Sequence, residues 1–217
     1  SFSVSAALIY PPSISVISGT TSGTLASTQV QDQTGTADDS SKYLALIPNA
    51  SKVSTTRYEF TIPTGSIDKL VLNVNFKGKP KTIQTWKFQA WDNVGAAWIN
   101  IADNTSAVDG EWSAITGQIV AADFTKYVNT SNILKFRIIT TNPLTTDTAK
   151  LDQLAFDVVS TPITPSWWQP TPGTTMHIQY AGTINTNLAG VEAYNIDLVD
   201  TAQATINAIK ANGKKVI

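Results

Sequence analysis

The sequence predicts an antiparallel β-sandwich, or jelly roll, followed by a shorter segment that combines strands with a helix. Two observations predict the sandwich. Between residues 13 and 159 apolar side chains recur with a period of two, and turn-forming residues interrupt these runs at short, regular intervals. A third observation predicts the change of fold, because a proline-rich stretch precedes a strand–strand–helix–strand pattern.

Each predicted strand of the first region has one apolar face. In residues 69–76, for example, Leu70, Leu72 and Val74 alternate with side chains that point the other way. Two sheets are needed to bury so many single apolar faces, which indicates a sandwich of about eight to ten strands. Closure of the same strands into a barrel is the alternative. The other alternating segments are 57–62, 84–92, 97–102, 134–139 and 154–158.

Composition excludes several classes of function. The 217 residues include 15 basic and 16 acidic side chains. The chain therefore has no large excess of positive charge that would attract nucleic acid or an anionic membrane. No cysteine is present and His177 is the only histidine, which excludes disulfides, thiol nucleophiles and multi-histidine metal sites. Charged residues make up only 14% of the chain, a composition typical of secreted, glycan-facing proteins, and we expect an extracellular location.

One predicted hairpin places two tryptophans on the polar face of its sheet. On the first strand the alternation turns Gln89 and Trp91 outward. On the second it turns Trp98 and Asn100 outward, and a turn over residues 92–97 makes the two tryptophans cross-strand neighbours. Two large aromatic side chains on a polar face require an explanation.

The tryptophan pair predicts a platform on which sugar rings stack, with Gln89, Asn100, Asn73 or Asn75 bonding hydroxyl groups. The alternative is that the pair covers the sheet beneath a loop or packs in a small second cluster, as large aromatic side chains usually do. Trp112 lies at a strand entrance, where it either extends the platform or closes the rim of the sandwich.

Asp38 and Asp39 are adjacent acidic residues in a loop and are the candidate ligands of a structural calcium ion, which binds to hard oxygen atoms. A solvated turn is the alternative for this pair. We expect no other cofactor and assign no catalytic residue within the chain.

The second region follows a linker over residues 160–173, which contains four prolines. Residues 174–217 then show two short strands, a helix over 201–212 and a further strand, an order that belongs to parallel α/β architecture. Asp200 and Gln203 have the spacing of a capping box at the start of this helix. Asn212-Gly213 is a typical C-terminal cap, in which a residue in the left-handed conformation ends the helix. His177 has no metal-ligand or catalytic motif partner nearby, and we expect it to be packed or at the surface.

Three segments of the second region resemble the start of a known catalytic domain. They are 168–186 (WQPTPGTTMHIQYAGTINT), 191–201 (VEAYNIDLVDT) and 213–217 (GKKVI). In this order they are similar to the opening of glycoside hydrolase family 114, the endo-α-1,4-polygalactosaminidases. The first region resembles the jelly-roll accessory domains that precede extracellular bacterial glycosidases.

The resemblance implies a partial (β/α)8 barrel, holding its first strands and first helix, within a hydrolase that acts on an α-1,4-linked galactosamine polymer. Matching positions make Gln179, Tyr194 and Asp197 the substrate-side candidates, and Asp200 also matches. Asn195 and Val199 replace the aspartate and the aromatic residue that the family usually has. The alternative for Asp197 is a bond to a neighbouring loop amide.

Glycoside hydrolysis ordinarily needs two carboxyl groups, and the family carries them on later strands. We therefore expect residues 1–217 alone to be inactive, and the exposed partial barrel to be covered by other structure or by an oligomer. The leading hypothesis is a carbohydrate-binding region, residues 1–159, joined to a truncated catalytic domain of a secreted polysaccharide hydrolase. The alternative is a non-catalytic adhesion or protein-interaction module, with residues 174–217 as a docking extension.

The charges on the polar faces bear on the identity of the glycan partner. Lys87, Lys135 and Arg137 all point outward in the predicted strands. Because they would repel a cationic, deacetylated galactosamine polymer, they favour a neutral or anionic glycan.

Overall fold

The computed structural model describes residues 5–141, 145–160, 170–197 and 199–217. The chain divides into two compact units, Ser1–Pro162 and Ile163–Ile217. The linker predicted over residues 160–173 lies for the most part outside the described residues. In the part of the chain that is described, no helix has the length and apolarity to cross a membrane.

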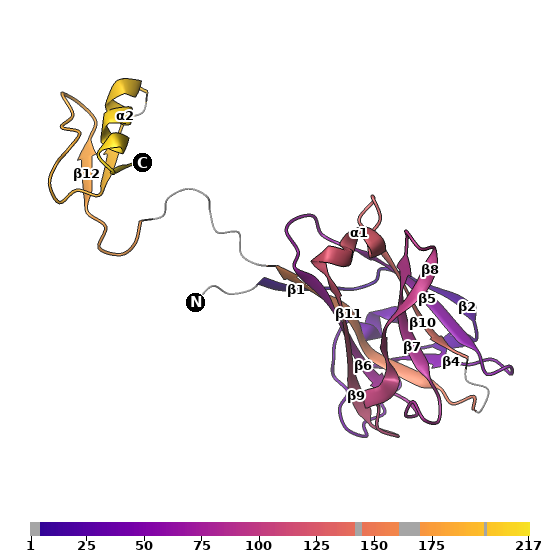
Figure 1. The fold of residues 1–217 in the computed structure, drawn as a ribbon. Coiled ribbons are helices and arrows are strands. Elements are labelled where there is room, and N and C mark those ends of the chain that lie inside the picture. Colours follow the sequence, from indigo (N-terminus) through magenta and orange to yellow (C-terminus); the bar gives the residue numbers. More distant parts are fainter. Residues whose placement is uncertain (1–4, 142–144, 161–169, 198) are drawn as a thin grey trace. The chain divides into compact units, whose positions relative to one another are not determined.

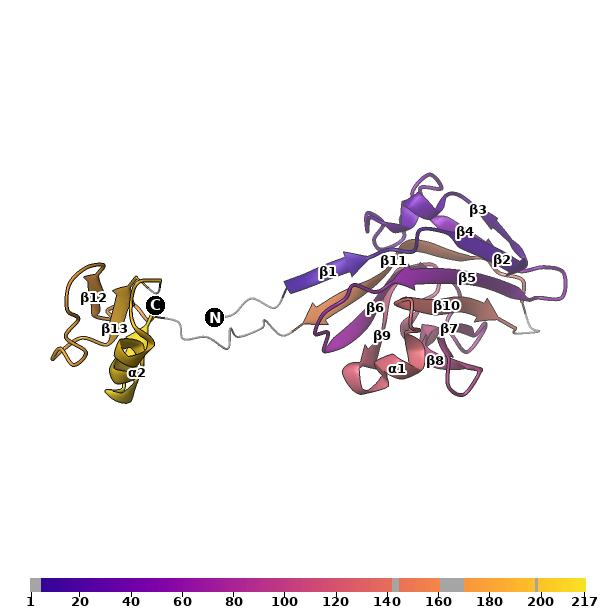
Figure 2. The same cartoon turned by 90° about the horizontal axis from the view of Figure 1, so that it is seen from above.

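The first unit contains two antiparallel sheets that form separate layers (Figures 1 and 2). The larger sheet has six strands in the order β3-β4-β11-β6-β9, and β1 also pairs with β11. Its strands are β1 (Ser5–Ile9), β3 (Thr20–Ser22), β4 (Leu44–Ile47), β6 (Lys69–Lys77), β9 (Trp112–Val120) and β11 (Ala149–Ser160).

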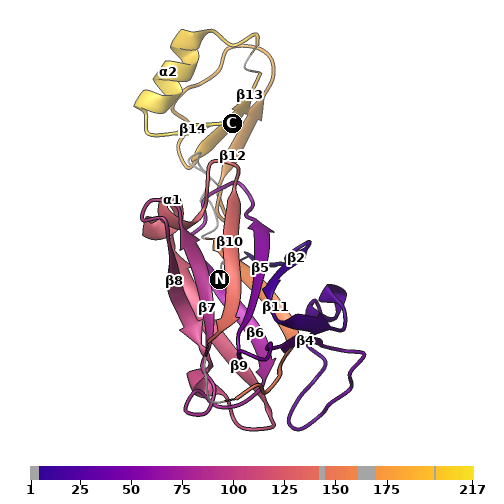
Figure 3. The same cartoon turned by 90° about the vertical axis from the view of Figure 1, so that its right-hand side faces the viewer.

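The smaller sheet has five strands in the order β2-β5-β10-β7-β8, which Figure 3 shows from β8 on the left to β2 on the right. Its strands are β2 (Ile14–Ser18), β5 (Ser54–Thr61), β7 (Trp86–Asp92), β8 (Ala97–Asp103) and β10 (Ile133–Thr140). Short helical turns connect the strands, namely Leu25–Thr28, Asn104–Ser106, Ala121–Asp123 and α1 (Phe124–Tyr127).

The predicted antiparallel sandwich is therefore confirmed, with eleven described strands in the first unit rather than eight to ten. The surplus comes from the N-terminal segment, where β1, β2 and β3 are short and add to sheet edges or pair over a few residues. Short strands of this kind carry too few residues for a periodic pattern to register.

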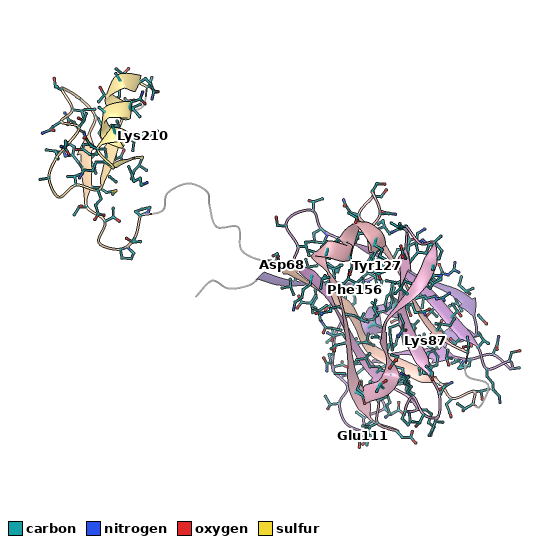
Figure 4. The ribbon with its side chains drawn as sticks, in the orientation of Figure 1. Asp68, Lys87, Glu111, Tyr127, Phe156 and Lys210 are labelled. Atoms are coloured by element: carbon teal, nitrogen blue, oxygen red, sulfur yellow. The ribbon has the colours of Figure 1, made fainter. Side chains whose placement is uncertain are left out.

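The core lies between the two sheets and is formed by the apolar faces that the alternation predicts. Phe60 and Phe136 come from the five-stranded sheet, and Phe156, labelled in Figure 4, comes from the six-stranded one. All three are fully buried, and the ring of Phe156 lies 4.9 Å from that of Phe60 and 5.7 Å from that of Phe136. Edge-to-face contacts of this kind join the two layers.

The described residues of the second unit form three parallel strands and one helix. The elements are β12 (Met176–Gln179), β13 (Ala193–Ile196), α2 (Gln203–Ala211) and β14 (Lys215–Val216), with β13 in the centre. The predicted strand–strand–helix–strand order is confirmed. Ile206 and Ile209 form the buried face of α2 and pack with Tyr194 and Ile196 of the central strand.

The predicted capping box at the start of α2 is wrong. The N-cap is Ala202, and no side chain caps the helix. The preceding turn engages Asp200 instead, because the Asp197 carboxylate accepts hydrogen bonds from the backbone amides of Val199 and Asp200 at 2.8 and 3.4 Å. The predicted stop is confirmed, since Asn212 is the C-cap and Gly213 has a φ of 73°.

Candidate functional site

Trp91 and Trp98 lie directly opposite each other on neighbouring strands β7 and β8, as the hairpin pattern predicts. Their ring centroids are 5.3 Å apart and their planes are inclined at 63°. Both side chains are only partly buried and point away from the core, whereas Ala90, the next residue toward the start of β7, is fully buried. The pair therefore forms a solvent-accessible aromatic patch on the outer face of the five-stranded sheet.

The turn between the two strands holds the tryptophans in register. The Asp92 carboxylate accepts hydrogen bonds from the amides of Val94 and Gly95 at 2.9 and 2.8 Å, and Lys126 lies 3.5 Å away as its counter-ion. The Gly95 amide in particular, helped by the Val94 amide and Lys126, holds the pKa of Asp92 below its ordinary value. This Asx-type turn matches the Asp-Asn-Val-Gly sequence that marks the turn.

Arg57 and Arg137 lie beside the aromatic patch. They are directly opposite each other on strands β5 and β10, and both guanidinium groups lie over the ring of Trp98, at 5.7 and 4.5 Å from its centroid. Arg137 also donates a 2.7 Å hydrogen bond from Nε to Oε1 of Gln89. Burial, and then the charge of Arg57, lower the pKa of Arg137 from its ordinary value.

These side chains belong to one row that crosses the five-stranded sheet. The strand registers place the row in the order Ser15, Arg57, Arg137, Gln89, Asn100. We call this row, together with Trp91 and Trp98, the aromatic–arginine face. A cross-strand row brings side chains within about 5 Å of their neighbours, so the face presents a continuous strip of ring, guanidinium and amide groups.

Of the amides predicted to accompany the tryptophans, Gln89 and Asn100 share the aromatic–arginine face. Asn100 is exposed, whereas Gln89 is 8% exposed and its amide oxygen is occupied by Arg137. Gln89 is thus placed to orient the arginine. Sequence reasoning did not single out Arg57, although its outward position on an alternating strand was a signal that could have identified it.

Asn73 and Asn75 cannot join the tryptophans, and this part of the prediction is wrong. Both lie on β6 of the six-stranded sheet, whose outward side chains point away from the sandwich on its opposite side. Asn75 is 4% exposed and donates hydrogen bonds to Gln33 O at 2.8 Å and to Asp152 Oδ2 at 2.7 Å. The residue therefore anchors a loop.

Trp112 is not part of the platform either, and the structure places it at the rim of the other sheet. It is 9% exposed on β9, its ring lies 6.0 Å from that of Tyr43, and its indole nitrogen donates to Ala37 O at 2.8 Å. Lys77 lies 5.9 Å from the centroid of the same ring. The indole thus fixes the loop before β4 against the sheet.

Asp38 and Asp39, the candidate calcium ligands, have separate partners. Both oxygens of Asp38 accept from Lys150 Nζ, at 2.6 and 2.7 Å, and Asp39 accepts from the amide and hydroxyl of Ser41. These contacts lower the pKa values of both carboxyl groups, through Lys150 for Asp38 and through the Ser41 hydroxyl for Asp39. Among the residues described, no group of three or more His, Cys, Asp or Glu residues could hold a metal ion. In this structure the two carboxylates bond within the protein, to Lys150 and to Ser41.

A cavity of about 570 Å³ lies over the six-stranded sheet near these loops. Its lining includes Tyr43, Lys77, Lys79 and Lys150. The lysines are engaged within the protein: Lys79 pairs with Asp109, Lys150 pairs with Asp38, and Lys77 donates to two backbone carbonyls. The sequence pattern did not predict this cavity, because its walls come from five separate segments.

The second unit has a pocket of about 260 Å³ beyond the carboxyl ends of β12 and β13. Gln179, Asp197 and Asp200 line it, so two of the three substrate-side candidates come together. Gln179 holds the pocket wall by donating to Ala181 O and Thr183 O at 3.0 and 3.1 Å. The carboxyl ends of parallel strands are where α/β folds place their binding sites.

Tyr194, the third candidate, is fully buried and does not line this pocket. Its hydroxyl donates to Asn185 O and accepts from the Leu188 amide, both at 2.9 Å. His177 packs against it with ring centroids 5.5 Å apart, and pairs with Gln179 Oε1 at 3.0 Å. The prediction of a substrate contact from Tyr194 is therefore wrong, because its polar atom is occupied by the loop that precedes β13.

Comparison with protein families decides the relationship of the chain. The sequence profile of the N-terminal glycosyl-hydrolase-114-associated domain matches residues 28–153, more than half of the chain. The chain belongs to this family. The profile of glycoside-hydrolase family GH114 matches residues 159–217, in agreement with the resemblance of the second region. No curated protein sequence matches the chain significantly.

Solved structures similar to the GH114-associated domain share little sequence with it. The CBM22-1 xylan-binding domain of Paenibacillus barcinonensis Xyn10C superposes with a TM-score of 0.41 at 12% identity, over 71% of this chain and 87% of that domain. The family 29 carbohydrate-binding module CBM29_1 of Piromyces equi gives 0.41 at 9% identity, over 72% and 92%. CBM35 from Cellvibrio japonicus Abf62 gives 0.38 at 12% identity, over 72% and 95%.

The chemistry available differs between the two units of this GH114-associated chain. On the GH114-associated domain, the aromatic–arginine face offers stacking surfaces and hydrogen-bond donors, a set that suits binding. In the GH114-matching unit, Asp197 and Asp200 supply carboxylates at the strand ends, and the amides of Val199 and Asp200 already occupy Asp197 Oδ1. The alternative stated for Asp197, a bond to a neighbouring loop amide, is the contact that forms.

Proposed function

We propose that the GH114-associated domain binds polysaccharide through the aromatic–arginine face, as the accessory region of a secreted glycoside hydrolase of family 114. The single observation that carries this proposal is the partly exposed Trp91–Trp98 pair on the outer face of a regular sheet. Indole faces stack on the C–H faces of pyranose rings, and the neighbouring polar groups suit ring hydroxyls. The proposal includes secretion, because a protein reaches an extracellular polysaccharide only after it leaves the cell.

The second unit corresponds in this proposal to the beginning of a (β/α)8 catalytic barrel. Its described residues supply three parallel strands and one helix, whereas a complete barrel has eight of each. We therefore expect residues 1–217 on their own to bind glycan without hydrolysing it. Gln179 and Asp197 would then face the substrate side of the barrel, and the polymer of α-1,4-linked galactosamine stays a candidate substrate of the barrel.

Retention of the full chain in affinity gels tests the proposed binding face. For a polysaccharide gel that retains the wild-type chain, we expect Trp98→Ala to weaken binding about tenfold, because stacked aromatic anchors dominate such interfaces. Trp91→Ala should weaken binding in the same direction. Val94→Ala is the matched control, since Val94 is 79% exposed in the turn of the same hairpin and lies outside the face. Equal retention of all four proteins would rule out the platform, and no retention by any glycan would favour an adhesion module.

A further inference from the structure

The two arginines of this chain lie together on the aromatic–arginine face. Of the 15 basic residues, 13 are lysines and only Arg57 and Arg137 are arginines. They lie 80 positions apart in the sequence, yet they occupy directly opposite positions on β5 and β10 and approach the same indole, Trp98. A planar guanidinium differs from a lysine ammonium in stacking on aromatic rings and in donating two parallel hydrogen bonds to one oxyanion.

The arrangement leaves positive charge without an acidic partner. Like charges at directly opposite positions destabilise a sheet, and Arg137 is also partly withdrawn from solvent. Among the described residues, the ion pairs involve lysines and no carboxylate lies within 4.0 Å of either guanidinium. The hydrogen bond to Gln89 Oε1 occupies only the Nε donor of Arg137. The terminal nitrogen atoms of both arginines are thus available to a ligand.

The surroundings of the pair are also positive. On the outward positions of β5, β7, β8 and β10, four side chains are cationic and two are acidic, so the balance is still positive. The cations are Arg57, Lys87, Lys135 and Arg137, and the acids are Glu59, opposite Lys135, and Asp103, opposite Lys87. Such a face attracts an anionic polymer and repels a cationic one.

We propose that the aromatic–arginine face recognises an acidic polysaccharide, with a sugar carboxylate held by Arg57 and Arg137 while its ring stacks at Trp98 and Trp91. This inference rests on the proposed function, because it names the class of glycan that the same face binds. A carboxylate accepts the paired donors of a guanidinium in one plane, and its negative charge offsets one of the two adjacent positive charges. A sulfate ester shares the same oxyanion chemistry, so the test includes it.

The test compares two polymers that differ in charge. Polygalacturonate carries a carboxylate on each sugar, and its methyl-esterified form has the same backbone with that charge removed. Sulfated galactan is the third ligand. Affinities for the full chain would be measured by affinity electrophoresis or isothermal titration calorimetry at low and at moderate salt.

We expect the wild-type chain to bind polygalacturonate at least about tenfold more tightly than the methyl ester, a preference that moderate salt reduces. Arg57→Gln is the main variant, because Arg57 is exposed and its replacement leaves the core intact. It should remove most of the preference for the acid while leaving weak binding to the ester. Arg57→Lys keeps the charge without the planar fork and should restore only part of the preference. Arg137→Gln should match Arg57→Gln, with circular dichroism confirming its fold.

Lys87→Gln is the control for charge alone. Lys87 lies exposed on β7, as labelled in Figure 4, two residues before Gln89. If Lys87→Gln lost as much of the preference for the acid as Arg57→Gln does, the proposed role of the arginine pair would be overturned. The preference would then come from the overall positive charge of the face. If sulfated galactan bound more tightly than polygalacturonate, and this binding depended on the arginines, the sugar carboxylate would be overturned as the recognised group.

Equal affinity for acid and ester, with both lost in Trp98→Ala, would overturn this inference and leave the proposed glycan face intact. Absence of binding to any of the three ligands, combined with no retention on neutral glycans, would overturn the proposed function itself. The two failures are therefore distinguishable.

Discussion

Asp152 shows at the scale of single residues how an outward position on a strand becomes buried. Its Oδ2 accepts hydrogen bonds from the amides of Asp32 and Gln33 at 3.0 and 2.9 Å, and from Asn75 Nδ2 at 2.7 Å. These contacts pull the loop before β4 onto the sheet and leave Asp152 fully buried. Burial raises the pKa of this carboxyl group against the opposing effect of its hydrogen-bond donors.

Replacing Asp152 with Ala is expected to lower the free energy of unfolding by about 2–4 kcal/mol, because three donors lose their common acceptor in a buried place. Urea denaturation of the full chain measures the loss. Asp152→Asn keeps an acceptor oxygen and is the matched comparison, with an expected cost of under about 1 kcal/mol. Similar midpoints for Asp152→Ala and the wild type would contradict the assigned role.

The β7–β8 hairpin is the element whose sequence most directly specifies its structure. Its turn residues place Asp92 where the carboxylate can accept two backbone amides, and alternation beyond the turn places Trp91 and Trp98 opposite each other. Both effects are local, since they involve residues that are neighbours along the chain. The aromatic–arginine face is therefore held in place by a turn whose stabilising residue, Asp92, lies outside the face.

The hairpin turn is expected to weaken at acid pH. The folded-state pKa of Asp92 lies below the value of 3.8 that applies to the unfolded chain. Its stabilising contribution is therefore fully present above that value and is lost as the pH falls through the folded pKa.

Comparison of the wild type with Asp92→Asn at about pH 6 and about pH 3 measures this contribution, because the amide oxygen still accepts the backbone bonds but does not titrate. We expect Asp92→Asn to have the lower urea midpoint at the higher pH and the difference to shrink at the lower pH. A pH-independent difference would show that the ionised carboxylate is not the stabilising group.

At the scale of the whole sandwich, the edges of the two sheets approach each other at β8 and β9. A Cβ atom on Gly117 of β9 would lie 2.5 Å from the carbonyl oxygen of Ile101 in β8. Only a residue without a side chain permits this approach, although the backbone angle of Gly117 is one that other residues adopt. The close contact seals one side of the core that Phe156 and its partners fill.

Gly117→Ala is expected to destabilise the sandwich by about 1–3 kcal/mol, because the added methyl group must displace backbone atoms. Thr116→Ala is the neighbouring control on an exposed position of the same strand, and its effect should stay within about 0.5 kcal/mol. Thermal denaturation followed by circular dichroism compares the two. Equal melting temperatures for both variants would mean that the strands can separate at this edge without cost.

The chain by itself determined the features that depend on neighbouring residues. Alternation specified the strands and their buried faces, the turn residues specified the hairpin, and the order of elements after the prolines specified the parallel unit. The facing tryptophans follow from the same local rules, because a short turn fixes the register of both strands.

Only the tertiary structure decided which outward residues share a surface. Asn75 and Trp112 alternate as regularly as Trp91 does, but they belong to the other sheet, and loops bury them. Arg57 and Arg137 meet because β5 pairs with β10, a contact between segments far apart in the sequence. Strand pairing over such distances depends on how all the apolar faces close into one core, a property that no local pattern contains.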